Sequence, residues 1–148
     1  MFDDVRDLYS AAIIERGRRP RHMRRLEAFD ATARGDNPMC GDRVQVWVKY
    51  GPRGAIAETG FDARGCEICK ASADLMVEAV GGRTPEQTRA LFAEFSSMAR
   101  TGEAPPEVPD SLRPLANVHE YPSRIKCATL AWTALVAALD GKGEATSE

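Results

Sequence analysis

Three short segments of the sequence carry its four cysteines, and they lie far apart in the chain. They are Asn-Pro-Met-Cys-Gly-Asp with Cys40, Gly-Cys-Glu-Ile-Cys with Cys66 and Cys69, and Arg-Ile-Lys-Cys with Cys127. Three of these thiols and the carboxylate of Asp42 match the ligand number of a tetrahedral zinc ion or of an iron-sulfur cluster. The cysteines therefore predict a single metal centre assembled from distant segments.

The expected local structure favours thiolates at two of these positions. Cys66 and Cys127 fall at or near the first turn of a predicted helix, and Cys40 lies on a predicted turn. Unpaired N–H groups and the positive end of the helix dipole stabilise a thiolate at a helix start. Asp42 could either bind the same metal as Cys40 or cap the turn or the following strand, and the residues alone favour neither reading.

The other candidate ligands have simpler interpretations. Cys69 shares a helical face with Cys66, but thioredoxin-like CxxC motifs occur with a parallel sheet, which the sequence does not predict. A small buried residue is the favoured interpretation of Cys69, and a ligand is the alternative. His22 and His119 are not adjacent to any cysteine in the sequence, so a surface or turn position is favoured over metal binding.

Composition limits the function classes. The 148 residues are 43% hydrophobic and 28% charged, with no apolar run near the ~20 residues that span a bilayer. The first residues do not resemble a secretory signal, so we expect a cytoplasmic protein with no membrane contact, whose cysteines bind metal or do chemistry rather than form disulfides.

Charge gives one further signal, in a chain whose net charge is only -2. Segment 16–25 contains six arginines. A solvated loop is favoured there over contacts with phosphates or with an acidic protein surface. The segment has no interleaved aromatic residues, so we expect no nucleic-acid partner.

The remaining residues predict an α+β fold with a small antiparallel sheet of about three strands covered by helices, in a single domain over 1–148. The first expected helix is capped by Asp3 or Asp4 and ended by Gly17 and Pro20, and strands are expected over 29–34, 43–50 and 55–61. Further helices are expected over 66–80, from Thr84 with a capping box to Gln87, and over 123–139, with one helical turn over 110–116. A flexible tail is expected over about 142–148.

The three cysteine segments together resemble the SufU/IscU family, which includes the NifU N-terminal domain. The resemblance runs from Leu8 to the last predicted helix. The 60 residues between Cys66 and Cys127 include a long segment that the shorter IscU branch lacks, and Lys126 stands where IscU-type members carry histidine. Both departures favour the SufU branch.

The resemblance implies a site of Cys40, Asp42, Cys66 and Cys127 that holds zinc or a transient iron-sulfur cluster. It further implies that Cys40 accepts persulfide sulfur from a SufS-type, pyridoxal-phosphate-dependent cysteine desulfurase, for later delivery to recipient apo-proteins. Cys69 departs from the family pattern, which has serine or another small residue at this position.

The expected mechanism is that of a zinc-dependent sulfurtransferase. A transient ligand from the partner enzyme would release Cys40 from the metal while the other three ligands keep it bound. Arg124 would stabilise a departing thiolate or persulfide, or else form a surface ion pair. Two alternatives stay open, namely a scaffold on which an iron-sulfur cluster is assembled and a structural zinc-binding module. Lys126 favours sulfur transfer over the scaffold.

Overall fold

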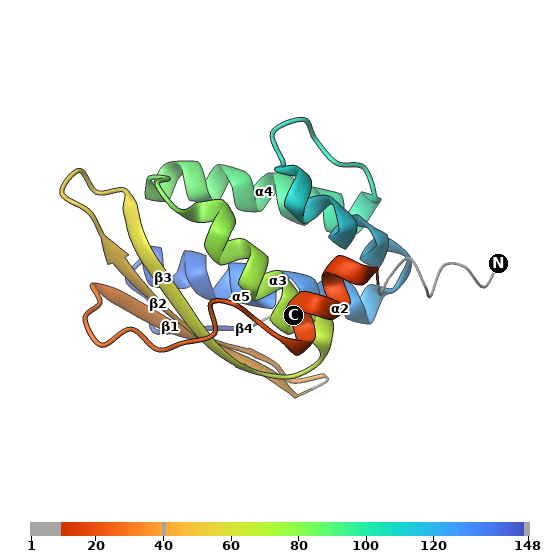
Figure 1. The fold of residues 1–148 in the computed structure, drawn as a ribbon, viewed down its shortest axis with the longest axis horizontal. Coiled ribbons are helices and arrows are strands. Elements are labelled where there is room, and N and C mark those ends of the chain that lie inside the picture. Colours follow the sequence, from red (N-terminus) through yellow and green to blue (C-terminus); the bar gives the residue numbers. More distant parts are fainter. Residues whose placement is uncertain (1–9, 40, 147–148) are drawn as a thin grey trace.

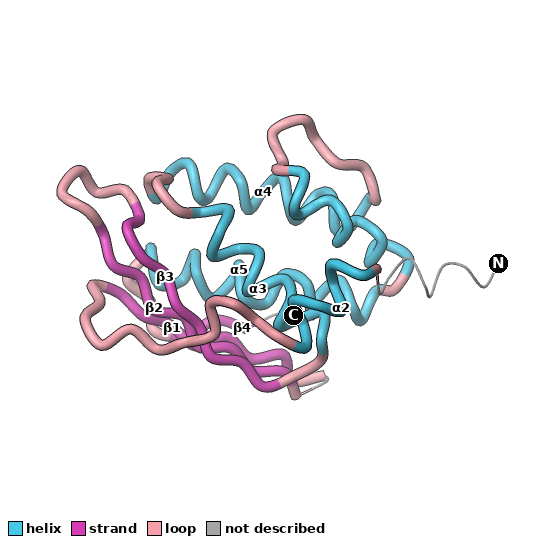
Figure 2. Tube along the Cα trace, viewed as in Figure 1, coloured by secondary structure: helices cyan, strands magenta, loops and turns pink. Residues whose placement is uncertain are grey.

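The computed structural model describes residues 10–39 and 41–146, with the strands in one layer and the helices in another (Figures 1 and 2). The elements are, in chain order, α2 (Ala11–Arg18), β1 (Ala31–Asn37), β2 (Asp42–Tyr50), β3 (Ile56–Arg64), α3 (Glu67–Val80), α4 (Pro85–Thr101), the 3-10 helix η1 (Asp110–Glu120), α5 (Pro122–Leu139) and β4 (Glu144–Thr146). The mixed α+β fold is as predicted, although the proposed cap at Asp3 or Asp4 lies outside the described residues.

The sheet has the strand order β3-β2-β1-β4, and β2 pairs antiparallel with both β1 and β3. Val44, Val46 and Val48 alternate along β2 and are fully buried under the helices. Strand β1 runs to Asn37 rather than to residue 34, and β3 runs to Arg64 rather than to residue 61. The longer strands carry one end of the sheet up to the first two cysteine segments.

The prediction of a flexible tail over about 142–148 is wrong for Glu144–Thr146. These residues form β4, which pairs in parallel with β1. The backbone N–H of Arg34 donates to the carbonyl of Gly143 over 2.9 Å, just before β4 begins. An edge strand pairs through its main-chain N–H and C=O groups, which every sequence has. The polar composition of the tail therefore did not indicate a strand.

In the described part of the chain, the helices lie on one face of the sheet. Helices α3 and α5 lie directly on it, and α4 and η1 pack farther out (Figure 1). The capping box is confirmed, because Thr84 Oγ1 accepts from Gln87 N–H over 3.1 Å and Gln87 Oε1 accepts from Thr84 N–H over 3.0 Å. Helix η1 is longer than the single turn expected over 110–116. Among the described residues, no helix has both the length and the apolar character needed to cross a membrane.

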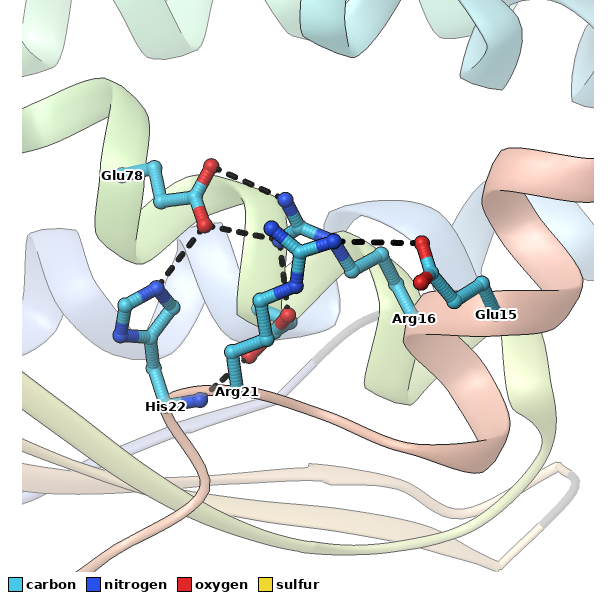
Figure 3. Close-up of polar contacts among 6 residues, drawn as sticks. Glu15, Arg16, Arg21, His22 and Glu78 are labelled. Atoms are coloured by element: carbon cyan, nitrogen blue, oxygen red, sulfur yellow. Dashed lines mark hydrogen bonds and ion pairs between the residues drawn. The ribbon is translucent and has the colours of Figure 1, made fainter.

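The arginine-rich segment is not a solvated loop throughout, because Arg16 lies in α2 and is buried. Arg16 Nη1 is 2.8 Å from Asp74 Oδ2 and 2.9 Å from Glu78 Oε2 (Figure 3). The backbone N–H of His22 donates to Asp74 Oδ1 over 2.7 Å, and His22 Nε2 lies 2.9 Å from Glu78 Oε2. These contacts fasten α2 and the segment after it onto α3, the helix that starts next to Cys66.

Candidate metal centre

Asp42 is the first residue of β2 and is 95% buried by the surrounding chain, with 5% of its surface exposed. It pairs with Asn37, the last residue of β1, so residues 38–41 form the connection between the two strands. Asn37 Oδ1 accepts from Met39 N–H over 3.1 Å and the Asn37 carbonyl accepts from Gly41 N–H over 2.8 Å. Gly41 has a φ of 80°, which glycine adopts without strain. This turn fixes the position of the Asp42 carboxylate.

Cys66 is the N-cap residue of α3, and one residue, Gly65, separates it from the end of β3. Its Sγ lies 3.9 Å from Asp42 Oδ2. The backbone of Cys69, in the first turn of the helix, helps to lower the pKa of the Cys66 thiol. Cys66 is therefore placed where helix N–H groups stabilise a thiolate, as the sequence predicts.

Cys127 lies in α5 and is 1% exposed. Sγ of Cys127 is 4.0 Å from Nη1 of Arg124, which lies one helical turn earlier. One ligand atom each from Asp42, Cys66 and Cys127 lies within 4.8 Å of the other two. Three segments that are distant in sequence thus meet at one point, and Asp42 joins the thiols rather than acting only as a local cap.

The two thiols of this group have opposite pKa shifts. The pKa of Cys66 is lowered to about 6, chiefly because the Cys127 thiol donates a hydrogen bond to its thiolate; burial and Asp42 oppose this, while the Cys69 backbone and Arg124 assist. The pKa of Cys127 is raised by the same hydrogen bond to Cys66, by burial and by Asp42. A bound cation would stabilise the thiolate forms of both cysteines, because metal binding displaces the thiol protons.

Cys40 lies outside the described residues, so its predicted role as a ligand and as the sulfur acceptor stays a prediction. Its neighbours in the chain, Met39 and Gly41, are both exposed, and 81% of the Met39 surface is accessible.

Cys69 is fully buried in the hydrophobic core and is not part of the three-residue ligand group. The packing interpretation therefore fits its position better than the ligand interpretation. His22 contacts Glu78, and Nδ1 of His119 lies 2.9 Å from the carbonyl oxygen of Ala116. Within the described part of the chain, neither histidine joins the metal-ligand group.

Two glycines that the sequence analysis did not identify as site residues contribute to the site. A Cβ on Gly65 would lie 2.7 Å from Cγ of Asp42, so only glycine lets the start of α3 approach the carboxylate this closely. A Cβ on Gly17 of α2 would lie 2.7 Å from Cβ of Glu67, the residue after Cys66. Gly65 directly precedes Cys66, and this adjacency could have identified it from the sequence as a residue of the site. The sequence around Gly17 gives no such indication.

Comparisons with known sequences identify relatives of this chain. The family model for the NifU-like N terminal domain matches residues 8–142. The iron-sulfur cluster assembly scaffold protein IscU of Streptococcus pyogenes serotype M1 is 37% identical over 133 residues, which cover 89% of this chain and 82% of the relative. The zinc-dependent sulfurtransferase SufU of Bacillus subtilis is 34% identical over 130 residues, which cover 86% of each chain.

Solved structures share the fold. The FiSufU protein of Fervidobacterium islandicum AW-1 superposes with a TM-score of 0.83 at 26% identity, over 90% of this chain and 98% of that one. A NifU-like N-terminal domain from Brucella abortus superposes with a TM-score of 0.82 at 22% identity, over 93% and 95% of the two chains. Because the family model matches nearly the whole sequence, this chain belongs to the NifU-like N-terminal domain family.

Proposed function

We propose that this protein acts in iron-sulfur cluster assembly, as a zinc-binding acceptor of persulfide sulfur from a SufS-type cysteine desulfurase. The observation that carries the proposal is the convergence of Asp42, Cys66 and Cys127, whose ligand atoms lie within 4.8 Å of one another. The similarity to the zinc-dependent sulfurtransferase SufU supports the same reading.

The donor set fits zinc. Two thiolates and a carboxylate are ligand types that zinc accepts in tetrahedral sites, and Cys40 would supply the fourth. Cys40 precedes Asp42 by two residues, a separation that the backbone spans with at most about 7 Å. When bound, zinc would supply the positive charge that keeps these sulfurs deprotonated.

The chemistry assigned to Cys40 is thiol exchange with a persulfide. The Cys40 thiolate attacks the outer sulfur of the desulfurase persulfide and forms a new S–S bond. The S–S bond of the donor breaks, and the donor cysteine leaves as a thiolate. The transferred sulfur keeps its oxidation state, so the step requires no external oxidant or reductant.

Arg124 would assist through its charge. Its guanidinium Nη1 is 4.0 Å from Cys127 Sγ, and its charge contributes to the lowered pKa of Cys66. A cation at this distance stabilises anionic sulfur in the site through its charge. We assign Arg124 the role of stabilising the thiolate or persulfide formed during transfer.

Mass spectrometry of the protein after incubation with a cysteine desulfurase and cysteine tests this function. We expect a gain of one sulfur atom on the peptide that contains Cys40. Cys40→Ser should abolish the gain, and Cys69→Ser should retain it, because Cys69 is fully buried and is not part of the ligand group. Sulfur loading on another cysteine, or none at all, would refute the acceptor role.

A second candidate function is that of a scaffold for iron-sulfur clusters, and the similarity to the Streptococcus pyogenes IscU scaffold supports it. Lys126 beside Cys127 argues for the acceptor, because a lysine side chain offers no imidazole ligand to a cluster. An absorption spectrum of protein purified without oxygen separates the two. Colourless protein with one zinc supports transfer, whereas brown protein supports the scaffold.

The proposed chemistry implies recipient proteins and a cellular compartment. Recipient apo-proteins would take the sulfur or the finished cluster from the chain. A reducing compartment keeps acceptor thiols available, so we assign the protein to the cytoplasm. We also propose that residues 1–148 form one domain, since the family match extends from residue 8 to residue 142.

A further inference from the structure

The face of the sheet opposite the helices carries two adjoining grooves. The first, of about 400 Å³, is lined on its polar side by Arg24, Arg25 and Asp62, with Trp47 and Met23 beside them. The second, of about 270 Å³, is lined by Arg34, Arg43 and Arg64. Gln45 and Asp62 line both, so the two grooves form one surface, which we call the outer groove.

The chain between α2 and β1 forms one wall of the outer groove. A Cβ on Gly60 of β3 would contact Arg24 and lie 3.3 Å from Leu26, so this connecting segment lies directly on the strand. Arg25 lies over the Trp47 ring, 5.7 Å from its centroid. Met23 and Phe29 in the same segment are 41% and 40% exposed. Exposed methionine and aromatic residues beside arginine are typical of protein interfaces.

The charges of the groove are incompletely balanced. Arg24 pairs with Glu58, Arg43 with Asp36, and Arg34 with both Asp36 and Glu144. Within the described residues, Arg25 and Arg64 form no ion pair with a carboxylate. Arg64 lies directly opposite Arg43 on the neighbouring strand, and like charges in that position are destabilising. An anionic partner would remove this repulsion.

We infer that the outer groove is a docking site for an acidic segment of a partner protein. Arg25 lies over Trp47, and Arg64 lies opposite Arg43. Trp47 and Arg43 are four residues apart on β2, so the two unpaired arginines are held at positions about 13 Å apart along the strand. The segment would therefore place two carboxylates about four residues apart in an extended chain, with an apolar side chain against Met23. A nucleic acid carries a charge on every phosphate and would meet the carboxylates of Asp36, Asp62, Glu58 and Glu144, whereas a segment with two separated carboxylates can place them at Arg25 and Arg64 alone. Arg25 also covers the Trp47 face on which a base would stack.

The position of the groove gives the docking site its significance. Arg43 directly follows Asp42, and Arg64 directly precedes Gly65 and Cys66. A segment bound at this end of the groove would bring its protein to the metal centre from the outer side of the sheet. The inference itself rests on the groove alone and does not require sulfur transfer.

Binding of a fluorescent peptide to the full-length protein tests the inference. The probe carries two glutamates four positions apart and one leucine, and the matched control peptide carries glutamines instead. We expect only the acidic peptide to bind, with affinity that falls as salt rises. Arg25→Glu/Arg64→Glu should weaken binding by at least about tenfold. Arg100→Glu/Arg113→Glu changes the net charge equally on the α4 and η1 side and should not weaken it.

Two further measurements make the result decisive. Peptide binding should change the protein's tryptophan fluorescence in the wild type and not in Trp47→Phe, since Trp132 is fully buried. Equal loss of binding in both double variants, or a fluorescence change that persists in Trp47→Phe, would overturn the inference. It would also be overturned by a single-stranded oligonucleotide that binds as tightly as the peptide and loses affinity in the same variant. Zinc content and sulfur loading, measured in parallel, report separately on the proposed function.

Discussion

Two buried polar clusters lie along α3, and they differ in how their charges are balanced. In the cluster around Arg16, the guanidinium is 2.8 Å from Asp74 and 2.9 Å from Glu78, and the His22 backbone adds a hydrogen bond of 2.7 Å to Asp74. At the candidate metal centre, ligand atoms of Asp42, Cys66 and Cys127 lie within 4.8 Å of one another, and Arg124 Nη1 is 4.0 Å from Cys127 Sγ.

This difference separates a structural cluster from a binding site. The Arg16 cluster contains both the cation and the anions that a buried ionic network requires. The candidate metal centre contains electron-pair donors, and Arg124 contacts them through a longer hydrogen bond of 4.0 Å to Cys127 Sγ, compared with 2.8 and 2.9 Å for the ion pairs of Arg16. We therefore expect the first cluster to stabilise the fold without any ligand, and the second to depend on a bound metal.

Metal removal should give the largest effect. Zinc at 1,000 times its dissociation constant would stabilise the folded state by about 4 kcal/mol. Thermal denaturation with and without a chelator measures this, and we expect a clear drop in melting temperature on chelation. The same drop should occur in Arg16→Ala, because the two clusters act independently. A melting temperature that does not change when the chelator is added would contradict the distinction between a structural cluster and a metal-binding site.

Arg16→Ala should lower the free energy of unfolding by about 3 kcal/mol, because it leaves the fully buried Asp74 carboxylate without its cation. Urea denaturation of the metal-free protein measures the loss. Arg18→Ala is the control, since its ion pair with Glu67 is exposed and should contribute less than about 1 kcal/mol. Equal effects of the two substitutions would show that burial of the Arg16 cluster is unimportant.

Gly65→Ala should weaken zinc binding by about 10- to 100-fold, because the new methyl group would displace the Asp42 carboxylate. Competition with a zinc-binding dye measures the affinity. Gly143→Ala is a suitable control, since no atom lies within 4 Å of the added carbon. Zinc affinity that stays at the wild-type value in Gly65→Ala would show that the close approach is not needed.

Acid should weaken the Arg16 cluster by a smaller amount. Burial raises the pKa of Glu78, but the hydrogen bonds from Arg16 and His22 outweigh it and leave the pKa below its ordinary value of 4.5. A lowered carboxyl pKa contributes stability that is present above pH 4.5 and is lost as the pH falls through the folded value. The stability difference between wild type and Glu78→Gln should therefore shrink on acidification below 4.5. A constant difference would contradict the assignment.

The local sequence was sufficient to predict several elements, including those that carry or adjoin the candidate metal ligands. Alternating valines placed β2, the capping box placed α4, and apolar spacing placed α3 and α5 within one or two residues. The meeting of Asp42, Cys66 and Cys127 was expected from residue type and from resemblance to a family, because no spacing rule links segments so far apart.

Other features depended on tertiary contacts that a local pattern cannot contain. Arg16 is buried because Asp74 and Glu78 lie on the neighbouring helix, although the sequence around it is strongly polar. Strand β4 forms because β1 offers an edge, and Gly65 matters because Asp42 comes within contact distance. In each case the partner lies more than 20 residues away in the sequence.

The most direct test of the metal centre is the zinc content of purified wild-type protein, Asp42→Ala and Cys127→Ser, measured with Arg16→Ala as a control. We predict one zinc per wild-type chain, the same in Arg16→Ala, and a marked loss in the two variants that remove a ligand. Zinc content unchanged in both Asp42→Ala and Cys127→Ser would contradict the proposal that these residues form the metal centre.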